Sequence, residues 1–220
     1  MTMDPPPFET LRAHYYGAIL ADPPWRFETW SDKGRDRSPD RHYRALPTEE
    51  IMALPVAALA APDCVLFLWV TWPMLLHTLR VITAWGFTYK TCAYDWTKAD
   101  ASQVELFQDD IDDPVMGGGH WTRANTEPCL LAVRGKPKRL HADVRQAIIE
   151  PRREHSRKPD CVYDRIERLV AGLIWNSSRV GTATDGMRGA MKSTNFRAGR
   201  GNEARPRRPR DYVTMPYRVT

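Results

Sequence analysis

The amino-acid sequence predicts an α/β fold built on an open sheet, and three observations support this prediction. Strand-like and helix-like segments alternate between residues 18 and 170. The run Val65–Val70 is continuously apolar over the length of one strand, as in parallel sheets covered on both faces. A shorter apolar run, Ala18–Ala21, ends at a polar motif. Open α/β sheets bind ligands at the carboxyl ends of their strands, so this motif marks a candidate site.

The individual elements follow from periodicity and from start and stop signals. Strands are expected at residues 18–21, 65–70, 87–96, 127–133 and 146–149. One helix is expected to begin at Thr48, which would cap it, with Ile51 and Leu54 on one face. A second is expected over residues 74–85 with a stop at Gly86, and a third over residues 160–170.

Composition restricts the class of protein. With 220 residues, 42% of them hydrophobic, the chain can form one well-packed core, and its length favours one domain. No apolar run reaches membrane-spanning length, and the N-terminus lacks a signal-peptide pattern. We therefore expect a soluble, cytoplasmic protein.

Neither cysteines nor histidines show the spacing of a metal site, so no metal is expected. The cysteines stand about thirty residues apart and are expected to be reduced core residues: Cys64, Cys92, Cys129 and Cys161. Surface or supporting roles are expected for three histidines: His42, His120 and His155.

The motif Asp22-Pro23-Pro24-Trp25 directly follows the first apolar run. The exocyclic amine of adenine is a weak nucleophile, because its lone pair is delocalised into the ring. The Asp22 carboxylate and the Pro23 carbonyl could each accept an amine hydrogen and direct that lone pair, while Trp25 could stack on the base. The motif alone is also compatible with a simple turn at the end of a strand.

Four motifs in order resemble the DPPW-type adenine methyltransferases. This family includes the catalytic subunit of the eukaryotic messenger-RNA adenosine methyltransferase and many bacterial and phage DNA adenine methyltransferases, and the chain looks like the bacterial and phage branch. The resemblance covers about residues 15 to 172. Its motifs are Asp22-Pro23-Pro24-Trp25, Leu66-Phe67-Leu68-Trp69-Val70-Thr71, Asn125-Thr126-Glu127-Pro128-Cys129-Leu130-Leu131 and His155-Ser156-Arg157-Lys158-Pro159-Asp160.

The resemblance implies a Rossmann-like sheet with helices on both faces, a permuted motif order and S-adenosylmethionine as cofactor. Asp22 to Trp25 match the catalytic motif, and Asp22 is also matched to the cofactor. Tyr43, Asn125 and Glu127 match substrate-pocket residues. Lys158 matches a lysine near the cofactor or the acceptor. The implied partner is nucleic acid, DNA rather than RNA, without a membrane; a protein partner or a homodimer stays open.

Three of these matches have a plainer interpretation. Lys158 could be a solvated side chain before a helix, because Pro159-Asp160 is a helix-start signal. Glu127 could be a charge on an edge strand, and Tyr43 could serve loop packing.

The chain departs from the family at Leu173. A strand of sequence Glu-Leu-Phe-Ala-Arg and a later Trp-Gly-Asn, which hold the cofactor's adenosine in the family, are absent. Both are encodable in a neighbouring reading frame at the expected spacing. We therefore expect residues 1–172 to form the methyltransferase domain, with a flexible segment at 1–14. The tail, residues 173–220, is interpreted as frame-shifted, basic and disordered, and the last strand as missing or disrupted.

The tail accounts for the positive charge of the chain. From Ile174 onward there are ten Lys+Arg and three Asp+Glu, a charge of +7, so residues 1–173 carry −2 of the total of +5. A basic arm of this kind can contact phosphates, although out-of-frame GC-rich codons also produce arginine. Two alternatives to adenine methylation stay open: transfer to the cytosine amine, and a non-catalytic nucleic-acid-binding remnant or partner.

Overall fold

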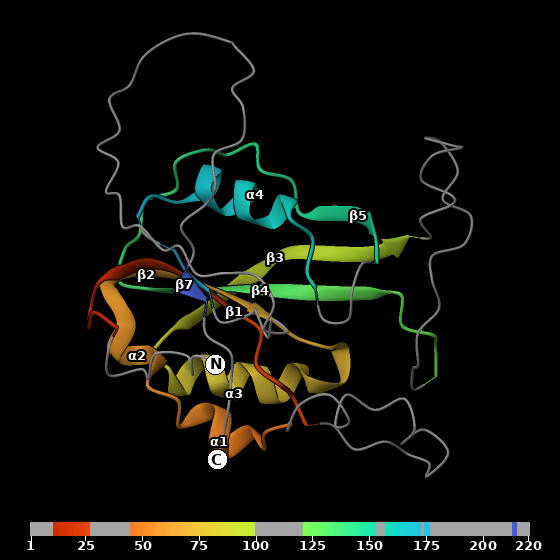
Figure 1. The fold of residues 1–220 in the computed structure, drawn as a ribbon, viewed down its shortest axis with the longest axis horizontal. Helices are drawn as coiled ribbons and strands as arrows, with labels where there is room; N and C mark the ends of the chain where they lie inside the picture. Colours follow the sequence, from red (N-terminus) through yellow and green to blue (C-terminus); the bar gives the residue numbers. More distant parts are fainter. Residues whose placement is uncertain are drawn as a thin grey trace, which may run out of the picture.

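A computed structural model of the chain describes residues 11–26, 45–99, 121–152, 157–172, 174–176 and 213–214. These residues form one mixed sheet with helices on both of its faces (Figure 1). The strands are β1 (Tyr16–Ala21), β2 (Ala60–Trp69), β3 (Thr88–Ala99), β4 (Thr126–Arg134), β5 (Ala147–Pro151), β6 (Ile174–Asn176) and β7 (Val213–Thr214). The helices are α1 (Thr48–Met52), α2 (Val56–Leu59), α3 (Leu75–Ala84), α4 (Cys161–Leu169) and the 3₁₀ helix η4 (Trp72–Met74).

The sheet has the strand order β5-β3-β4-β2-β1-β6-β7. β1 pairs in parallel with β2 and with β6, and β3 pairs in parallel with β5. β4 is antiparallel to both of its neighbours, β2 and β3. The carboxyl ends of β1, β2, β3 and β5 therefore point to the same edge of the sheet, where β4 begins.

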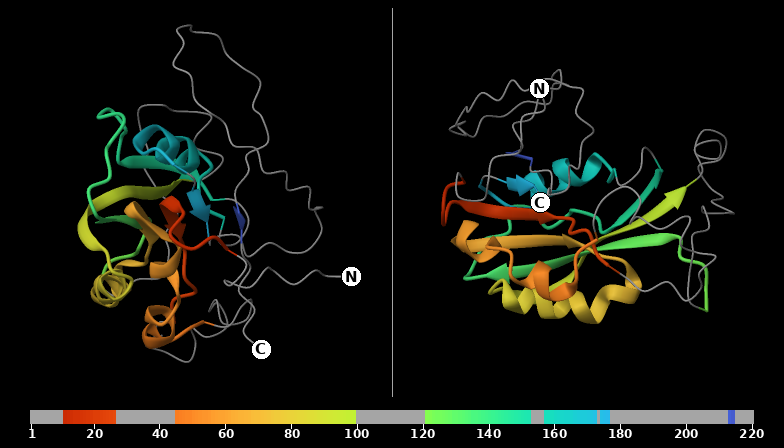
Figure 2. Two further views of the ribbon diagram at one scale, coloured as in Figure 1. Left: turned by 90° about the vertical axis from the view of Figure 1, so that its left-hand side faces the viewer. Right: turned by 60° about the horizontal axis from the view of Figure 1, so that its bottom comes forward.

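Two apolar cores lie on opposite sides of the sheet, because successive side chains of a strand point to opposite faces. Ile19, Leu66 and Leu68 pack with α1, α2 and α3 in one core. Leu20, Phe67 and Trp69 pack with α4 in the other. The two views of Figure 2 show α4 apart from α1 and α3, with the sheet between them. The prediction of an α/β sheet covered on both faces is confirmed.

The predicted elements occur at the expected places, with small differences at their ends. Gly86 follows α3 with a φ of +76°, a backbone conformation that glycine adopts easily, so the predicted helix stop is confirmed. The predicted cap is wrong: Pro47 occupies the position before α1, and the Thr48 hydroxyl lies 3.3 Å from His77 Nδ1 instead.

A strand of only three residues, β6, follows α4 beside β1, so the last strand is present but short, in line with the expectation that it is missing or disrupted. β6 is three residues long, and its register places Ile174 opposite Ala18 and Asn176 opposite Leu20. The Asn176 side chain is buried and donates a hydrogen bond of 3.0 Å to the Tyr163 hydroxyl of α4. β6 is thus short, yet its last residue is anchored to the helix that precedes it.

The cysteines of the described residues are all free thiols. Cys64 and Cys129 are buried, as predicted, whereas Cys92 and Cys161 are only partly buried. None of the helices in the described ranges is long and apolar enough to cross a membrane.

Candidate active site at the carboxyl edge of the sheet

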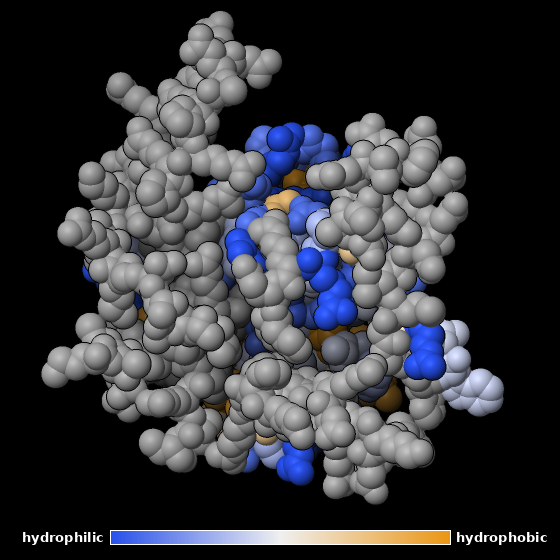
Figure 3. All heavy atoms as spheres, turned by 45° about the vertical axis from the view of Figure 1, so that its right-hand side comes forward, coloured by the Kyte–Doolittle hydropathy of each residue, from blue (hydrophilic) through white to orange (hydrophobic). Residues whose placement is uncertain are grey.

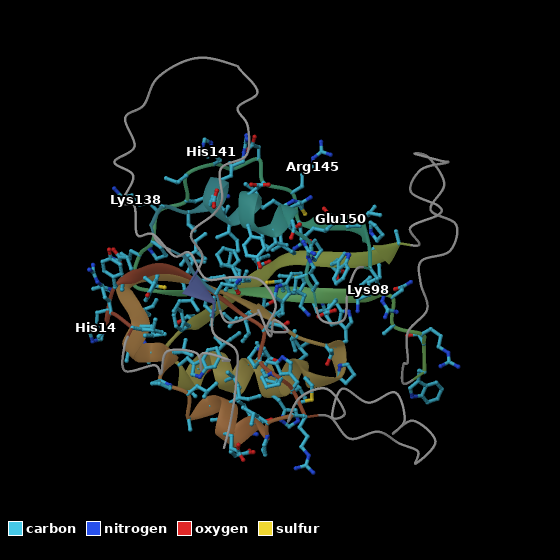
Figure 4. All side chains as sticks on the ribbon, viewed as in Figure 1. His14, Lys98, Lys138, His141, Arg145 and Glu150 are labelled. Atoms are coloured by element: carbon cyan, nitrogen blue, oxygen red, sulfur yellow. The ribbon has the colours of Figure 1, made fainter. Side chains whose placement is uncertain are left out.

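Four charged side chains meet at the carboxyl edge of the sheet, each delivered by a different part of the topology. Asp22 follows β1, Lys98 lies near the end of β3, Glu127 lies near the start of β4, and Lys158 stands between β5 and α4. Figure 4 labels Lys98 toward this end of β3. The strand directions and the connection from β5 to α4 therefore bring together residues that are up to 136 positions apart in the sequence.

Lys158 is the centre of this group, which we call the ionic cluster: Asp22, Lys98, Glu127 and Lys158. Its ammonium lies 3.2 Å from Asp22 Oδ2 and donates a short hydrogen bond to Glu127 Oε1. The same ammonium stands 5.3 Å from the centre of the Trp69 ring, a cation–π contact. Only 9% of the Lys158 side chain is exposed, so the interpretation of a solvated lysine is wrong.

Glu127 is held from both sides. Lys98 Nζ lies 2.9 Å from Glu127 Oε2, while Lys158 takes Oε1. β4 lies between β2 and β3, so the interpretation of Glu127 as an edge-strand charge is also wrong. The ammonium of Lys98 itself lies 5.2 Å from the centre of the Trp96 ring.

The two carboxyl groups of the cluster have opposite pKa shifts. Burial raises the pKa of Asp22, and the charge of Glu127 adds to this, although Lys158 and Lys98 oppose it. Burial also acts to raise the pKa of Glu127, but Lys158 and Lys98 outweigh it and lower that pKa to about 2. Burial opposes the charge of Lys158, yet the two carboxylates raise its pKa overall. Glu127 is therefore a permanent anion at neutral pH, and Asp22 is the carboxylate that takes up a proton more readily.

The backbone of the motif Asp22-Pro23-Pro24-Trp25 is fixed by pairing with residues 45–47. The N–H of Leu46 donates to the Pro24 carbonyl at 2.8 Å, and the N–H of Arg26 donates to the Leu46 carbonyl at 3.2 Å. The Pro23 carbonyl accepts the N–H of Trp25 at 2.8 Å. A carbonyl oxygen has two lone pairs, so Pro23 retains one acceptor position.

Trp25 does not lie as the stacking role requires. Its side chain is 7% exposed within the core beneath α1 and α3, and its indole N–H donates to the Trp69 carbonyl at 3.0 Å. With its faces packed against apolar neighbours, Trp25 joins the ends of β1 and β2. The sequence could not indicate this, because the burial comes from the segment around Leu46.

Of the other predicted pocket residues, Asn125 lies at this edge and Tyr43 falls outside the described residues. Asn125 directly precedes β4, and its carbonyl accepts the N–H of Lys98 at 3.0 Å. His42, His120 and His155 also lie outside the described ranges. Figure 3 views the molecule from the side toward which β3 points in Figure 1, and hydrophilic side chains run down the middle of that face.

Sequence analysis missed Lys98 and Trp69. Lys98 lies two residues beyond the predicted strand 87–96, and the observed β3 extends past it to Ala99, beside the start of β4. Trp69 lies inside the resembling motif, but its contact with Lys158 depends on the packing of α4 against the sheet.

The cluster fits the polar end of a sulfonium amino-acid cofactor. The two carboxylates can accept from an amino group, and the two lysines can donate to a carboxylate. The Trp69 Nε1, next to Lys158, is a buried donor without a hydrogen-bond partner in the described structure. A buried donor in this state is consistent with a site that a ligand or water completes.

The sheet, its carboxyl-edge site and the Asp-Pro-Pro-Trp motif define an α/β methyltransferase of the amino-group class. The comparison with known families agrees: MT-A70 matches residues 16–178, so the chain belongs to the MT-A70 family. This confirms the resemblance inferred from the four motifs.

Several curated proteins are similar to this chain. Type II methyltransferase M.MunI of a Mycoplasma species is 30% identical over 183 residues, covering 76% of this chain and 72% of that protein. A probable N(6)-adenosine-methyltransferase MT-A70-like of rice is 29% identical over 157 residues, covering 70% of this chain and 19% of that protein. The human N(6)-adenosine-methyltransferase catalytic subunit METTL3 is 28% identical over 158 residues, covering 71% and 24%. The chain thus spans most of the bacterial relative and a quarter or less of these two eukaryotic relatives.

Proposed function

We propose that this protein transfers a methyl group from S-adenosylmethionine to the exocyclic amine of adenine in nucleic acid, with DNA as the substrate. The observation that carries the proposal is the position of Asp22, which begins the catalytic motif and faces the buried Lys158 at 3.2 Å. An acceptor for an amine hydrogen and a cation for a carboxylate then stand side by side at the ligand-binding edge of the sheet.

Asp22 is proposed to act on the acceptor amine. As an anion it accepts one amine hydrogen, and the free lone pair of the Pro23 carbonyl accepts the other, which turns the nitrogen lone pair toward the methyl group. The cofactor supplies a methyl group on a sulfonium sulfur. When the N–C bond forms and the C–S bond breaks, the amine must lose one proton. The raised pKa of Asp22 suits it to receive that proton.

Lys158 and Glu127 are proposed to hold the ligands in place. Lys158 can bind the cofactor carboxylate as a compact positive charge, while Glu127 stays ionised and fixes the position of the lysine. Asn125 directly precedes β4, two residues before Glu127, and is proposed, with Tyr43, to line the acceptor side of the pocket.

The preference for DNA rests on the extent of the similarity. The chain and the Mycoplasma type II methyltransferase match over most of both lengths, whereas the adenosine methyltransferases of plants and animals are much longer than the matched part. The experiment is methyl transfer from labelled cofactor to matched DNA and RNA oligonucleotides, with the product identified by mass spectrometry. Methylated adenine in DNA is the expected product. Methylated cytosine would contradict the choice of base, and RNA-only labelling would contradict the choice of polymer.

We further propose that the tail, residues 173–220, arose by a frameshift near the Gly172 codon and weakens cofactor binding. The absent family sequence after Leu173 supports this. Sequencing of the coding region tests the origin, because the missing strand must appear in a neighbouring frame. Calorimetry tests the consequence: micromolar cofactor affinity in the chain as written would show that the site is complete.

A further inference from the structure

Trp72 differs from the other indoles of the described core. Its side chain is 44% exposed, whereas Trp25, Trp69 and Trp85 are at most 7% exposed. It is nevertheless held in place, because its indole N–H donates to the Thr126 hydroxyl at 2.9 Å. The Thr126 hydroxyl in turn hydrogen-bonds the Asp95 carboxylate. An aromatic ring that is held in this way can bind a flat ligand at a low entropic cost, since little rotamer freedom is left to lose.

Trp72 stands at the same edge of the sheet as the ionic cluster, on the other face. It begins η4, three residues after Trp69, whose ring contacts Lys158. Its partner Thr126 directly precedes Glu127 in β4, and neighbouring residues of a strand point to opposite faces. Asp22 and Glu127 face α4, so Trp72 lies on the side of α3.

The surroundings of Trp72 are polar, which favours a polar aromatic ligand over an apolar one. Among the described residues, two buried oxygens near it lack a hydrogen-bond partner: Thr71 Oγ1 and Asp95 Oδ1. Thr71 precedes Trp72 in the chain, and Asp95 contacts Thr126. Burial raises the pKa of Asp95, which the hydrogen bond from Thr126 only partly offsets.

We infer that Trp72 is a stacking platform for a nucleobase of the nucleic-acid substrate, next to the acceptor adenine, and that Thr126 is its positioning residue. This inference rests on the proposed function and adds a contact to it. Trp25 is packed in the core, so it presents no open face to a base. Trp72 presents an exposed aromatic ring at the same edge of the sheet. The platform binds a neighbouring base, since the acceptor amine itself must reach Asp22 on the opposite face. Aromatic stacking accepts any base, so the contact strengthens affinity without choosing a sequence.

The test measures binding of a fluorescent oligonucleotide by anisotropy with the full chain, independently of methyl transfer. Trp72→Ala is expected to weaken the affinity by roughly 10-fold or more, from the usual contribution of base stacking. Thr126→Val is expected to weaken it less, and Thr126→Ser to restore it, because serine keeps the hydroxyl. Leu76→Ala is the matched control: Leu76 lies one turn along the same segment, is 75% exposed, and should change the affinity less than about twofold.

Three results would overturn the inference. Trp72→Ala could bind the oligonucleotide as tightly as the original chain, or no oligonucleotide could bind to either. Alternatively, Trp72→Ala could shift the oligomeric state in size-exclusion chromatography together with any affinity change, which would make Trp72 a protein contact. If Trp72→Ala loses affinity while neither the original chain nor the variant methylates, the stacking platform is supported and the proposed function is contradicted. Failure of the platform and failure of the proposed function are therefore distinguishable.

Discussion

The two faces of the sheet differ sharply at the carboxyl edge. The α4 face carries the buried part of the ionic cluster, namely Asp22, Glu127 and Lys158. On the face of α1 and α3, Trp25 is buried and donates its indole N–H to the backbone carbonyl of Trp69. The motif that follows β1 therefore places its first side chain in the ionic cluster and its last in the apolar core. The difference teaches that one four-residue motif can supply both a charged site and a structural joint.

The largest effect is expected from removing the Asp22 carboxylate on the α4 face. Asp22→Ala should lower methyl transfer by roughly 100-fold or more, since a group that accepts a proton in the reaction typically contributes at least this factor. The control is Asp143→Ala, which removes an exposed carboxylate that pairs with Arg168 on the surface, away from the ionic cluster. Labelled-methyl incorporation measures both. Undiminished transfer by Asp22→Ala would contradict the assigned role.

On the opposite face, Trp25→Ala should lower the free energy of unfolding. Deleting a buried indole leaves a cavity and an unpaired carbonyl on Trp69, at a cost of about 3–5 kcal/mol. Thermal unfolding followed by circular dichroism measures this loss. Trp72→Ala should leave the melting temperature almost unchanged, because its ring is 44% exposed. If Trp25→Ala kept its stability but lost oligonucleotide affinity, the stacking role would belong to Trp25 after all.

The network of charges predicts opposite shifts of the pH dependence in two variants. Activity should fall at low pH as Asp22 becomes protonated, at a higher pH than for an ordinary aspartate because its pKa is raised. Lys158 lowers that pKa, so Lys158→Met should move the acid limb to higher pH. Glu127 raises it, so Glu127→Gln should move the limb to lower pH. Rate measurements across pH 4 to 9, roughly the span in which perturbed carboxyl groups titrate, test both. Shifts in the same direction would exclude Asp22 as the titrating group.

The smallest effect is expected at Lys98. Its ammonium pairs with Glu127, whereas Asp22 pairs with Lys158. Lys98→Met should raise the pKa of Glu127 from about 2 and lower the rate only a few-fold, because Lys158 still holds the carboxylate. Lys90→Met is the control, since Lys90 is an exposed lysine of the same strand. Loss of activity comparable to that of Asp22→Ala would place Lys98 on a ligand.

The strands and helices could be predicted from the sequence because each carries its own periodicity. The sequence predicts three residues of the cluster as site residues: Asp22, Glu127 and Lys158. Their mutual contacts depend on a strand order that differs from the order in the sequence, and no local pattern encodes that order. The burial of Trp25 and the missing cap at Thr48 have the same cause. Both depend on residues 45–47, a short segment without periodicity that gains its conformation by pairing with the motif.

The ionic cluster carries no net charge, since two ammonium groups balance two carboxylates. A neutral quadrupole produces a field that decays within a few ångströms and is weak beyond the screening length of about 8 Å at physiological salt. The cluster therefore cannot attract a polyanion over a distance. We expect the association rate of a long nucleic acid, and its dependence on ionic strength, to be governed by basic residues elsewhere, while the cluster acts only on groups already in contact with it.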